Sequence, residues 1–241
     1  MPEYKPKSTP IGEAWNHRQL VTRYDALLRR LSVGPPNFVN ILIAHSLVAV
    51  GWRQNIWWYN AWGAQVGKWT GNWYTKRTKE EADGVEYEVP NQRWRAFKDW
   101  RQATQDTLER IGPTSWNAAY TAAWRIAFDG GSAADYWEQL GVGGYYTSTA
   151  FTPAKFQSLH DRVVSELAAA TPEEKAAAES WVDAEVDAGR MGIAAGTRRV
   201  PPSGVLEQVF GGLMLGAIVV GTYVIGRALA KRPTYAGDSK W

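Results

Sequence analysis

Tryptophan is concentrated in one part of the chain, and this limits the folds that the chain can adopt. The sequence has 241 residues and 14 tryptophans, and eleven of these lie between Trp52 and Trp137. Side chains of this size are largely buried in most proteins, so the segment predicts a well-filled core. With 45% apolar residues, the chain is long enough for one main domain with appendages.

The densest group of these rings lies over residues 56–63, directly after an apolar segment. Trp and Tyr have only two side-chain torsions and combine a large apolar body with a polar tip, so they lose little entropy on binding a partner. We therefore expect some of the rings to line a groove that binds sugars, and the others to fill the core.

Charge and composition exclude several kinds of site. The net charge is +3, from 27 basic and 24 acidic residues, and gives little support to nucleic acid binding. The chain has no cysteine, which excludes disulfides, thiolate metal sites and cysteine nucleophiles. His17, His45 and His160 lack the spacing of metal ligands, and no phosphate-binding or dinucleotide motif occurs, so we expect no metal and no cofactor.

The hydrophobic pattern divides the chain into five parts. We expect a polar arm and a helix over residues 1–36, the main domain over 37–170, a helical spacer and linker over 171–205, a membrane span over 206–232 and a polar tail over 233–241. The amino-terminal residues lack the apolar core of a secretory signal.

The main domain is expected to be mainly helical with one hairpin. Residues 37–53 are almost wholly apolar and predict a buried helix. Two strand-like runs, 73–79 and 85–89, flank Asp83-Gly84, which is a strong hairpin signal. Helical periodicity returns from residue 93 onward.

Two later helices have recognisable first residues. Thr152 precedes Pro153, and the pair suits an N-cap followed by the first turn of a helix. Thr171 and Glu174 have the spacing of a capping box. The helix that Thr171 begins is alanine-rich and acidic, ends near Gly189 and is expected to be a solvated spacer.

A membrane anchor is predicted near the carboxyl terminus. Val209–Gly226 is a stretch of eighteen uncharged residues, and with the next four residues it is long enough to span a bilayer. We expect residues 209–230 to contact lipid in this way, with a buried core helix as the alternative. Gly212 and Gly216 form a small-residue pair through which two anchors could associate as a homo-oligomer.

The basic residues that follow the span favour a tail on the inner side of the membrane. The pattern leaves open whether this membrane belongs to a cell envelope or to a virus.

Five short motifs follow one another in the main domain. They are Tyr59-Asn60-Ala61-Trp62-Gly63, Trp69-Thr70-Gly71, Thr78-Lys79-Glu80, Arg93-Trp94-Arg95-Ala96-Phe97 and Gly144-Tyr145-Tyr146-Thr147. In this order and spacing, residues 37–166 resemble the glucosaminidase domain of bacterial peptidoglycan hydrolases, a lysozyme-like family. The resemblance implies a mainly α (α+β) lysozyme-like domain with a small hairpin lobe, and peptidoglycan glycan strands as the partner.

The sequence departs from this family at one decisive position. The family carries a general-acid glutamate on its core helix, and Ala49 stands at the corresponding place. Residues 31–79 contain no Asp or Glu. Glycoside cleavage needs an acid and a second carboxylate, and only Glu80 is placed to be the second one. We therefore expect a protein that binds glycan with impaired or lost hydrolysis.

The resemblance also implies which side chains contact the glycan. One of two adjacent tyrosines should face the substrate while the other packs, because neighbours on an extended segment point to opposite sides. Arg53 could bind a carboxylate of the substrate or lie in solvent. The implied glycan contacts are Trp52, Arg53, Asn60, Trp62, Trp69, Tyr145 and Tyr146.

Other interpretations stay open at this point. His45, one helical turn before Ala49, could supply the missing proton or be an ordinary core residue. Glu80 could belong to the charged outer face of a hairpin. The chain could also be an active β-N-acetylglucosaminidase or lytic transglycosylase that uses Glu80, or a structural membrane or virion protein that uses the fold to bind other proteins.

Overall fold

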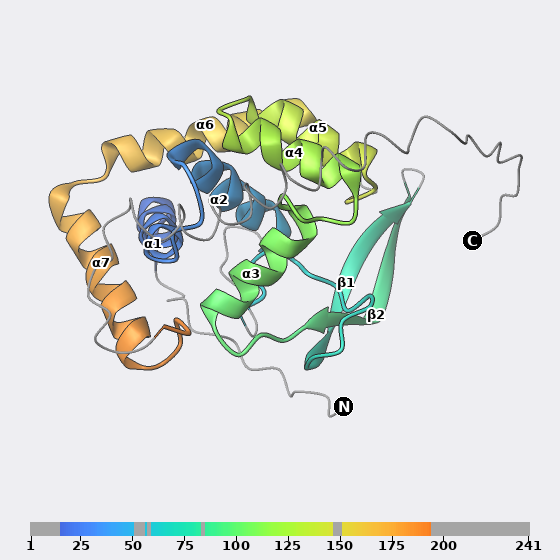
Figure 1. The fold of residues 1–241 in the computed structure, drawn as a ribbon, viewed down its shortest axis with the longest axis horizontal. Helices are drawn as coiled ribbons and strands as arrows, with labels where there is room; N and C mark the ends of the chain where they lie inside the picture. Colours follow the sequence, from blue (N-terminus) through green and yellow to red (C-terminus); the bar gives the residue numbers. More distant parts are fainter. Residues whose placement is uncertain (1–14, 51–55, 57–58, 83–84, 147–150, 194–241) are drawn as a thin grey trace, which may run out of the picture. The chain divides into compact units, whose positions relative to one another are not determined.

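Helices make up most of the structure, and one β-hairpin accompanies them (Figure 1). The structure is a computed structural model, and it describes residues 15–50, 56, 59–82, 85–146 and 151–193. The elements in these ranges are α1 (His17–Arg30), α2 (Pro36–Val50), β1 (Trp73–Ala82), β2 (Val85–Arg95), α3 (Trp100–Ile111), α4 (Ala118–Phe128), α5 (Ala133–Val142), α6 (Pro153–Ala169) and α7 (Pro172–Asp187). The prediction of a mainly helical chain with a small hairpin is confirmed.

Helix α2 forms the centre of the helical part. Phe38, Ile41, Leu42 and Ile43 on this helix are fully buried. Their helix packs against α1, α4 and α6, which explains why it has almost no polar face. The predicted helix is confirmed as far as Val50, and it is buried over residues 41–47. Its last three expected residues lie outside the described ranges.

The capping residues that the sequence indicates are in place. The Thr171 hydroxyl accepts a hydrogen bond from the Glu174 backbone N–H at 3.2 Å, and the Glu174 carboxylate accepts one from the Thr171 N–H at 2.9 Å. Thr152 caps α6 through its hydroxyl alone, which accepts a hydrogen bond from the Lys155 N–H at 3.3 Å, and Pro153 lies in the first turn. These bonds satisfy backbone donors that the start of a helix leaves unpaired.

Helix α7 differs from the solvated spacer that its composition predicts. It packs along α1, and Val182 and Val186 are buried. The Glu185 carboxylate is 6% exposed and accepts hydrogen bonds from Trp100 Nε1 at 3.2 Å and from the Arg190 guanidinium. The sequence pattern did not reveal the buried face of this helix, because small alanine side chains allow close helix packing without a long stripe of large apolar residues.

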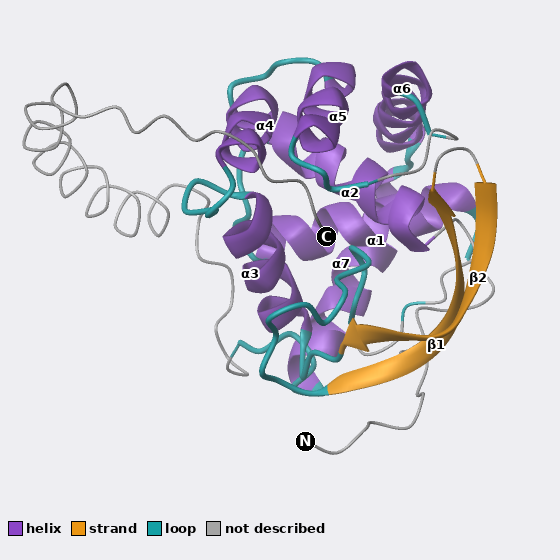
Figure 2. Ribbon diagram, turned by 90° about the vertical axis from the view of Figure 1, so that its right-hand side faces the viewer, coloured by secondary structure: helices purple, strands orange, loops and turns teal. Residues whose placement is uncertain are grey.

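The two strands form one long, curved antiparallel hairpin (Figure 2). Trp73 pairs with Arg95 at its base, and the register shifts between Lys76 and Thr78. Both strands are longer than the sequence pattern predicts, because the polar residues around Glu80 continue the ladder. Strand β1 ends at Ala82, and β2 begins at Val85. The predicted turn at Asp83-Gly84 lies outside the described residues.

No helix in the described ranges is long and apolar enough to cross a membrane. The predicted span over residues 209–230, with Gly212 and Gly216, lies outside those ranges.

Trp100 at the start of α3 joins three parts of the core. Its ring makes edge contacts with Tyr24 at 6.4 Å, Tyr59 at 5.2 Å and Trp181 at 6.4 Å between ring centroids. These neighbours come from α1, the turn after α2, and α7. The ring therefore holds together segments that are distant in sequence.

Replacing Trp100 with Ala should lower the free energy of unfolding by about 3–5 kcal/mol, because it leaves a cavity and removes the Trp100 hydrogen bond to the buried Glu185. Trp116, which is 85% exposed, supplies the matched control. Trp116→Ala should change stability by less than about 0.5 kcal/mol. Urea denaturation of the two variants measures the difference, and equal losses would contradict the assignment of Trp100 to the core.

Candidate functional site

The end of α2, a tight turn and strand β2 meet around Ala49. Ala49 is exposed at the penultimate position of the helix. A Cβ placed on Gly63 would lie 3.3 Å from the Ala49 Cβ and 3.6 Å from Cζ3 of Trp94. Gly63 also has a φ of +57°, a backbone conformation that residues other than glycine rarely adopt. Ala49 is the residue at which the resemblance expects the acid, and this correspondence stays a prediction.

Asn60 shapes the turn that approaches Ala49. Its side-chain amide donates to the carbonyls of Ala64 at 2.9 Å and Arg95 at 3.1 Å, and its side-chain oxygen accepts from the Ala64 N–H at 2.7 Å. The residue is 2% exposed. This placement differs from the expected glycan contact, because all these bonds serve to fix the turn and attach it to β2.

Trp62 also lies in the core instead of lining a groove. Its ring is 2% exposed, and Nε1 donates to the Leu42 carbonyl of α2 at 3.1 Å. The sequence motif gave no sign of the direction of this indole. A small Gly63 and a left-handed Tyr59 (φ +59°) allow the chain to turn this ring inward.

Trp69 is half-buried at the base of the hairpin. Its Nε1 donates to the Asn72 carbonyl at 2.8 Å, and its ring packs edge-on against Phe97 with 5.5 Å between centroids. The Arg95 guanidinium carbon lies 5.2 Å from the ring centroid. A Cβ on Gly71 would come within 2.3 Å of the indole, which explains the Trp-x-Gly spacing.

The two adjacent tyrosines have different surroundings. Tyr146 stacks on Trp137 with 4.6 Å between centroids and 11° between planes, and its hydroxyl donates to the Trp137 carbonyl at 3.1 Å. Tyr145 instead makes edge contacts with His45 at 5.0 Å and Tyr120 at 5.7 Å. Both side chains are half-buried, and a hydrogen bond to a backbone carbonyl orients each hydroxyl.

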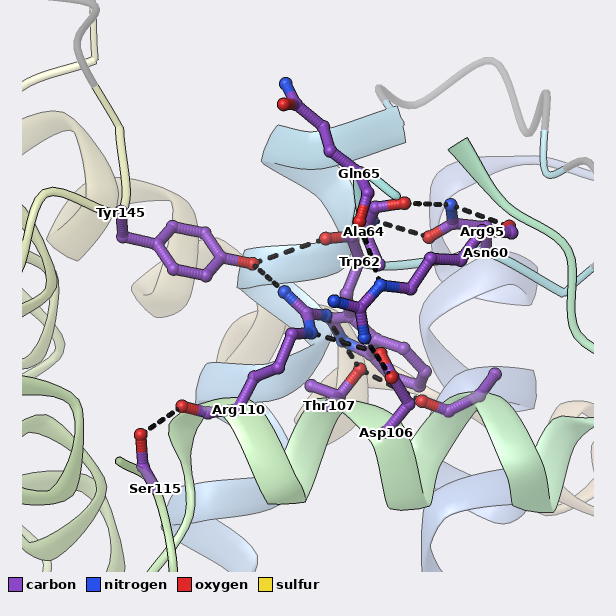
Figure 3. A network of polar contacts seen from close by, with 11 residues as sticks. Asn60, Trp62, Ala64, Gln65, Arg95, Asp106, Thr107, Arg110, Ser115 and Tyr145 are labelled. Atoms are coloured by element: carbon purple, nitrogen blue, oxygen red, sulfur yellow. Dashed lines mark hydrogen bonds and ion pairs between the residues drawn. The ribbon is translucent and has the colours of Figure 1, made fainter. Parts of the chain in front are cut away.

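A polar network holds Tyr145 in position (Figure 3). Its hydroxyl donates to the Trp62 carbonyl at 3.3 Å and accepts from Arg110 Nη1 at 3.4 Å. The Asp106 carboxylate pairs with Arg110 at 3.1 Å and also with Arg95 at the end of β2. Figure 3 shows these residues converging from α3, the hairpin, the turn after α2 and the segment that follows α5.

Within this network the Asp106 carboxylate faces two guanidinium groups, those of Arg95 and Arg110. Burial disfavours the charged Arg110, but Tyr145 and Asp106 beside it outweigh that cost and raise the pKa of the guanidinium. Sequence reasoning missed the network. The only local signal is the spacing of Asp106 and Arg110 at i and i+4 on one helix, while Arg95 comes from another element.

Asp106→Asn should destabilise the protein by about 3–5 kcal/mol, because it leaves two partly buried arginines without the carboxylate that pairs with both. Glu109 is exposed on the same helix, and Glu109→Gln is the matched control, with an expected change below about 0.5 kcal/mol. Thermal and urea denaturation measure both. Similar stability in the two variants would show that the ion pairs are dispensable.

His45 is a buried member of this region. It is 1% exposed, Nδ1 lies 2.9 Å from the Tyr136 hydroxyl, and Nε2 has no hydrogen-bond partner among the described residues. Burial, and secondarily the charge of Arg110, lower the pKa of His45 to about 3. The imidazole is therefore neutral at neutral pH and closed to solvent, which argues against its use as the missing acid.

The lowered pKa predicts a specific pH dependence. Between about pH 6.5 and pH 3 the unfolded chain binds a proton at His45 that the folded chain does not, so stability falls as the pH falls through this window. By pH 5 the loss should reach about 2 kcal/mol. His45→Gln should remove that part of the slope, whereas His17→Gln, at an exposed position, should keep it. Urea titrations at several pH values measure the slopes.

Three predicted site residues are located only in part or not at all. Glu80 lies on β1 and pairs through its backbone with Tyr87 of β2. Trp52 and Arg53 lie outside the described residues. In the described ranges no group of His, Asp and Glu side chains is arranged to hold a metal ion.

The helical part also contains a hollow of about 250 Å³ between α1, α6 and α7. None of the predicted site residues lines it. The lining side chains are Thr22, Asp25, Ala26, Arg29, Leu167, Lys175, Ala178 and Glu179.

Comparison with known proteins finds similarity in solved structures alone. No protein-family model and no curated protein matches the chain. A peptidoglycan hydrolase mutant from Sphingomonas sp. A1 is 21% identical, with a TM-score of 0.49, over 63% of this chain and 98% of that one. A truncated glycoside hydrolase domain of FlgJ from Salmonella typhimurium is 19% identical, with a TM-score of 0.43, over 62% and 99%.

The catalytic domain of the autolysin Auto from Listeria monocytogenes is 17% identical, with a TM-score of 0.43, over 64% of this chain and 89% of that one. These structures are of the kind of protein that the sequence motifs resemble.

Proposed function

We propose that this protein binds peptidoglycan glycan strands and has impaired or lost hydrolytic activity. The observation that carries the proposal is the exposed methyl of Ala49, at the junction of α2, the turn at Gly63 and β2. The motif order in the sequence supports the lysozyme-like assignment independently of this position.

The chemistry of glycoside cleavage explains why hydrolysis depends on the residue at position 49. One carboxylic acid protonates the leaving oxygen, and a second carboxylate acts as nucleophile or base from across the bond. Ala49 has no proton to give, and residues 31–79 supply no Asp or Glu. Loss of a positioned general acid commonly lowers the rate by ~10²- to 10⁴-fold.

Binding does not depend on that acid. Tyr145 presents a half-buried ring whose hydroxyl is fixed by the Trp62 carbonyl and Arg110. A ring that is already held in place loses little conformational entropy when a sugar stacks on it. Glycan contact can therefore persist after the proton donor is gone.

The proposal includes a membrane location. The uncharged stretch Val209–Gly226, extended to residue 230, would hold the glycan-binding domain beside a bilayer. Expression with residues 206–241 removed would test this, with membrane sedimentation as the measurement.

The test of the main proposal compares binding with cleavage. Wild-type protein should be retained on purified peptidoglycan in a pull-down, without releasing reducing ends above background. Ala49→Glu should raise that release at least ~10-fold by restoring a proton donor. Ala168→Glu is the matched control, because Ala168 is also an exposed penultimate residue, on α6.

Release of reducing ends by the wild type at rates comparable with an active hydrolase would contradict the loss of activity. Absence of retention on peptidoglycan would contradict glycan binding itself.

A further inference from the structure

Trp116 is the most exposed of the large apolar side chains in the described ranges. It lies on the segment that connects α3 to α4, and it is 85% exposed. Exposed indole rings are uncommon in folded domains, because burial of such a side chain is strongly favourable. A ring left in solvent at this level is a candidate contact for a ligand.

Hydrogen bonds fix the segment that carries Trp116. The Ser115 hydroxyl donates to the Arg110 carbonyl at 2.5 Å and accepts from the Asn117 N–H at 3.2 Å. The Asn117 side chain donates to the Gly143 carbonyl at 3.0 Å and caps α4 by accepting from the Ala119 N–H. Both neighbours of Trp116 are thus fixed, so the indole projects from an ordered turn.

Trp116 continues a series of aromatic rings that includes Tyr145. Its ring meets Tyr120 with 6.2 Å between centroids, and Tyr120 meets Tyr145 at 5.7 Å. A Cβ on Gly143 would lie 2.3 Å from the Tyr120 ring, so this glycine leaves the space that Tyr120 occupies. The series therefore runs from the Tyr145 ring to an exposed indole.

We propose that Trp116, supported by Tyr120, forms an additional sugar-binding subsite that stacks on a pyranose ring beyond the one at Tyr145. This rests on the proposed glycan binding and extends it to longer strands. Thr114, Ser115 and Asn117 flank the indole, so the surface is one apolar ring beside polar groups. That combination suits a sugar, whose ring has apolar faces and hydroxyl edges, better than a protein partner, which prefers a cluster of apolar anchors.

Calorimetric titration with chitin oligosaccharides of two lengths tests the proposal. Trp116→Ala should weaken binding of the hexasaccharide about 5-fold, equivalent to about 1 kcal/mol, and leave binding of the disaccharide unchanged. Trp116→Phe should recover most of the loss, because it keeps an aromatic face. Val164→Ala, at an apolar position of α6 that is 40% exposed, is the control and should change neither affinity.

Tyr145→Ala separates this inference from the proposed function. It should weaken both oligosaccharides, because both lengths occupy the site at Tyr145. If Tyr145→Ala weakens binding and Trp116→Ala does not change the hexasaccharide affinity, the additional subsite is wrong and glycan binding stands. If the wild type binds neither oligosaccharide nor peptidoglycan, both proposals fall.

Discussion

The arrangement around Ala49 depends on the ion pairs that the Asp106 carboxylate makes with two arginines. The carboxylate joins Arg95 at the end of the hairpin to Arg110 of α3, and Arg110 in turn contacts the Tyr145 hydroxyl. A buried charge is tolerated only when its partners remain in place, so the three elements are fixed together. The position of the candidate glycan contact is therefore set by a charge that the glycan itself would not touch.

In the same region, the residues that hold the structure together are different from the aromatic rings that are accessible to a ligand. Asn60 and Trp62 are almost fully buried, and their hydrogen bonds hold the turn against α2 and β2. Tyr145, Tyr120 and Trp116 lie on the accessible side in a continuous series of rings. A rigid base with aromatic rings above it is an arrangement that favours binding without a large entropic cost.

Local patterns in the sequence predicted the local structure well. The capping box at Thr171, the apolar helix up to Val50 and the hairpin around Asp83-Gly84 each depend on residues close in the chain. The buried face of α7 and the direction of Trp62 depend on distant partners, which periodicity does not encode. For the same reason the sequence gave no sign of Arg110, which bonds to the Tyr145 hydroxyl, or of the exposure of Trp116; the glycan contact at Tyr145 stays a prediction.

The place of Ala49 near the carboxyl end of α2 has an electrostatic consequence. The carbonyls at this end of a helix carry a partial negative charge, which disfavours a carboxylate and raises its affinity for a proton. A glutamate at this position would therefore be a stronger proton holder and would also destabilise the helix end. Alanine, the strongest helix former, places no charge there, so the residue that the sequence has at position 49 favours the helix.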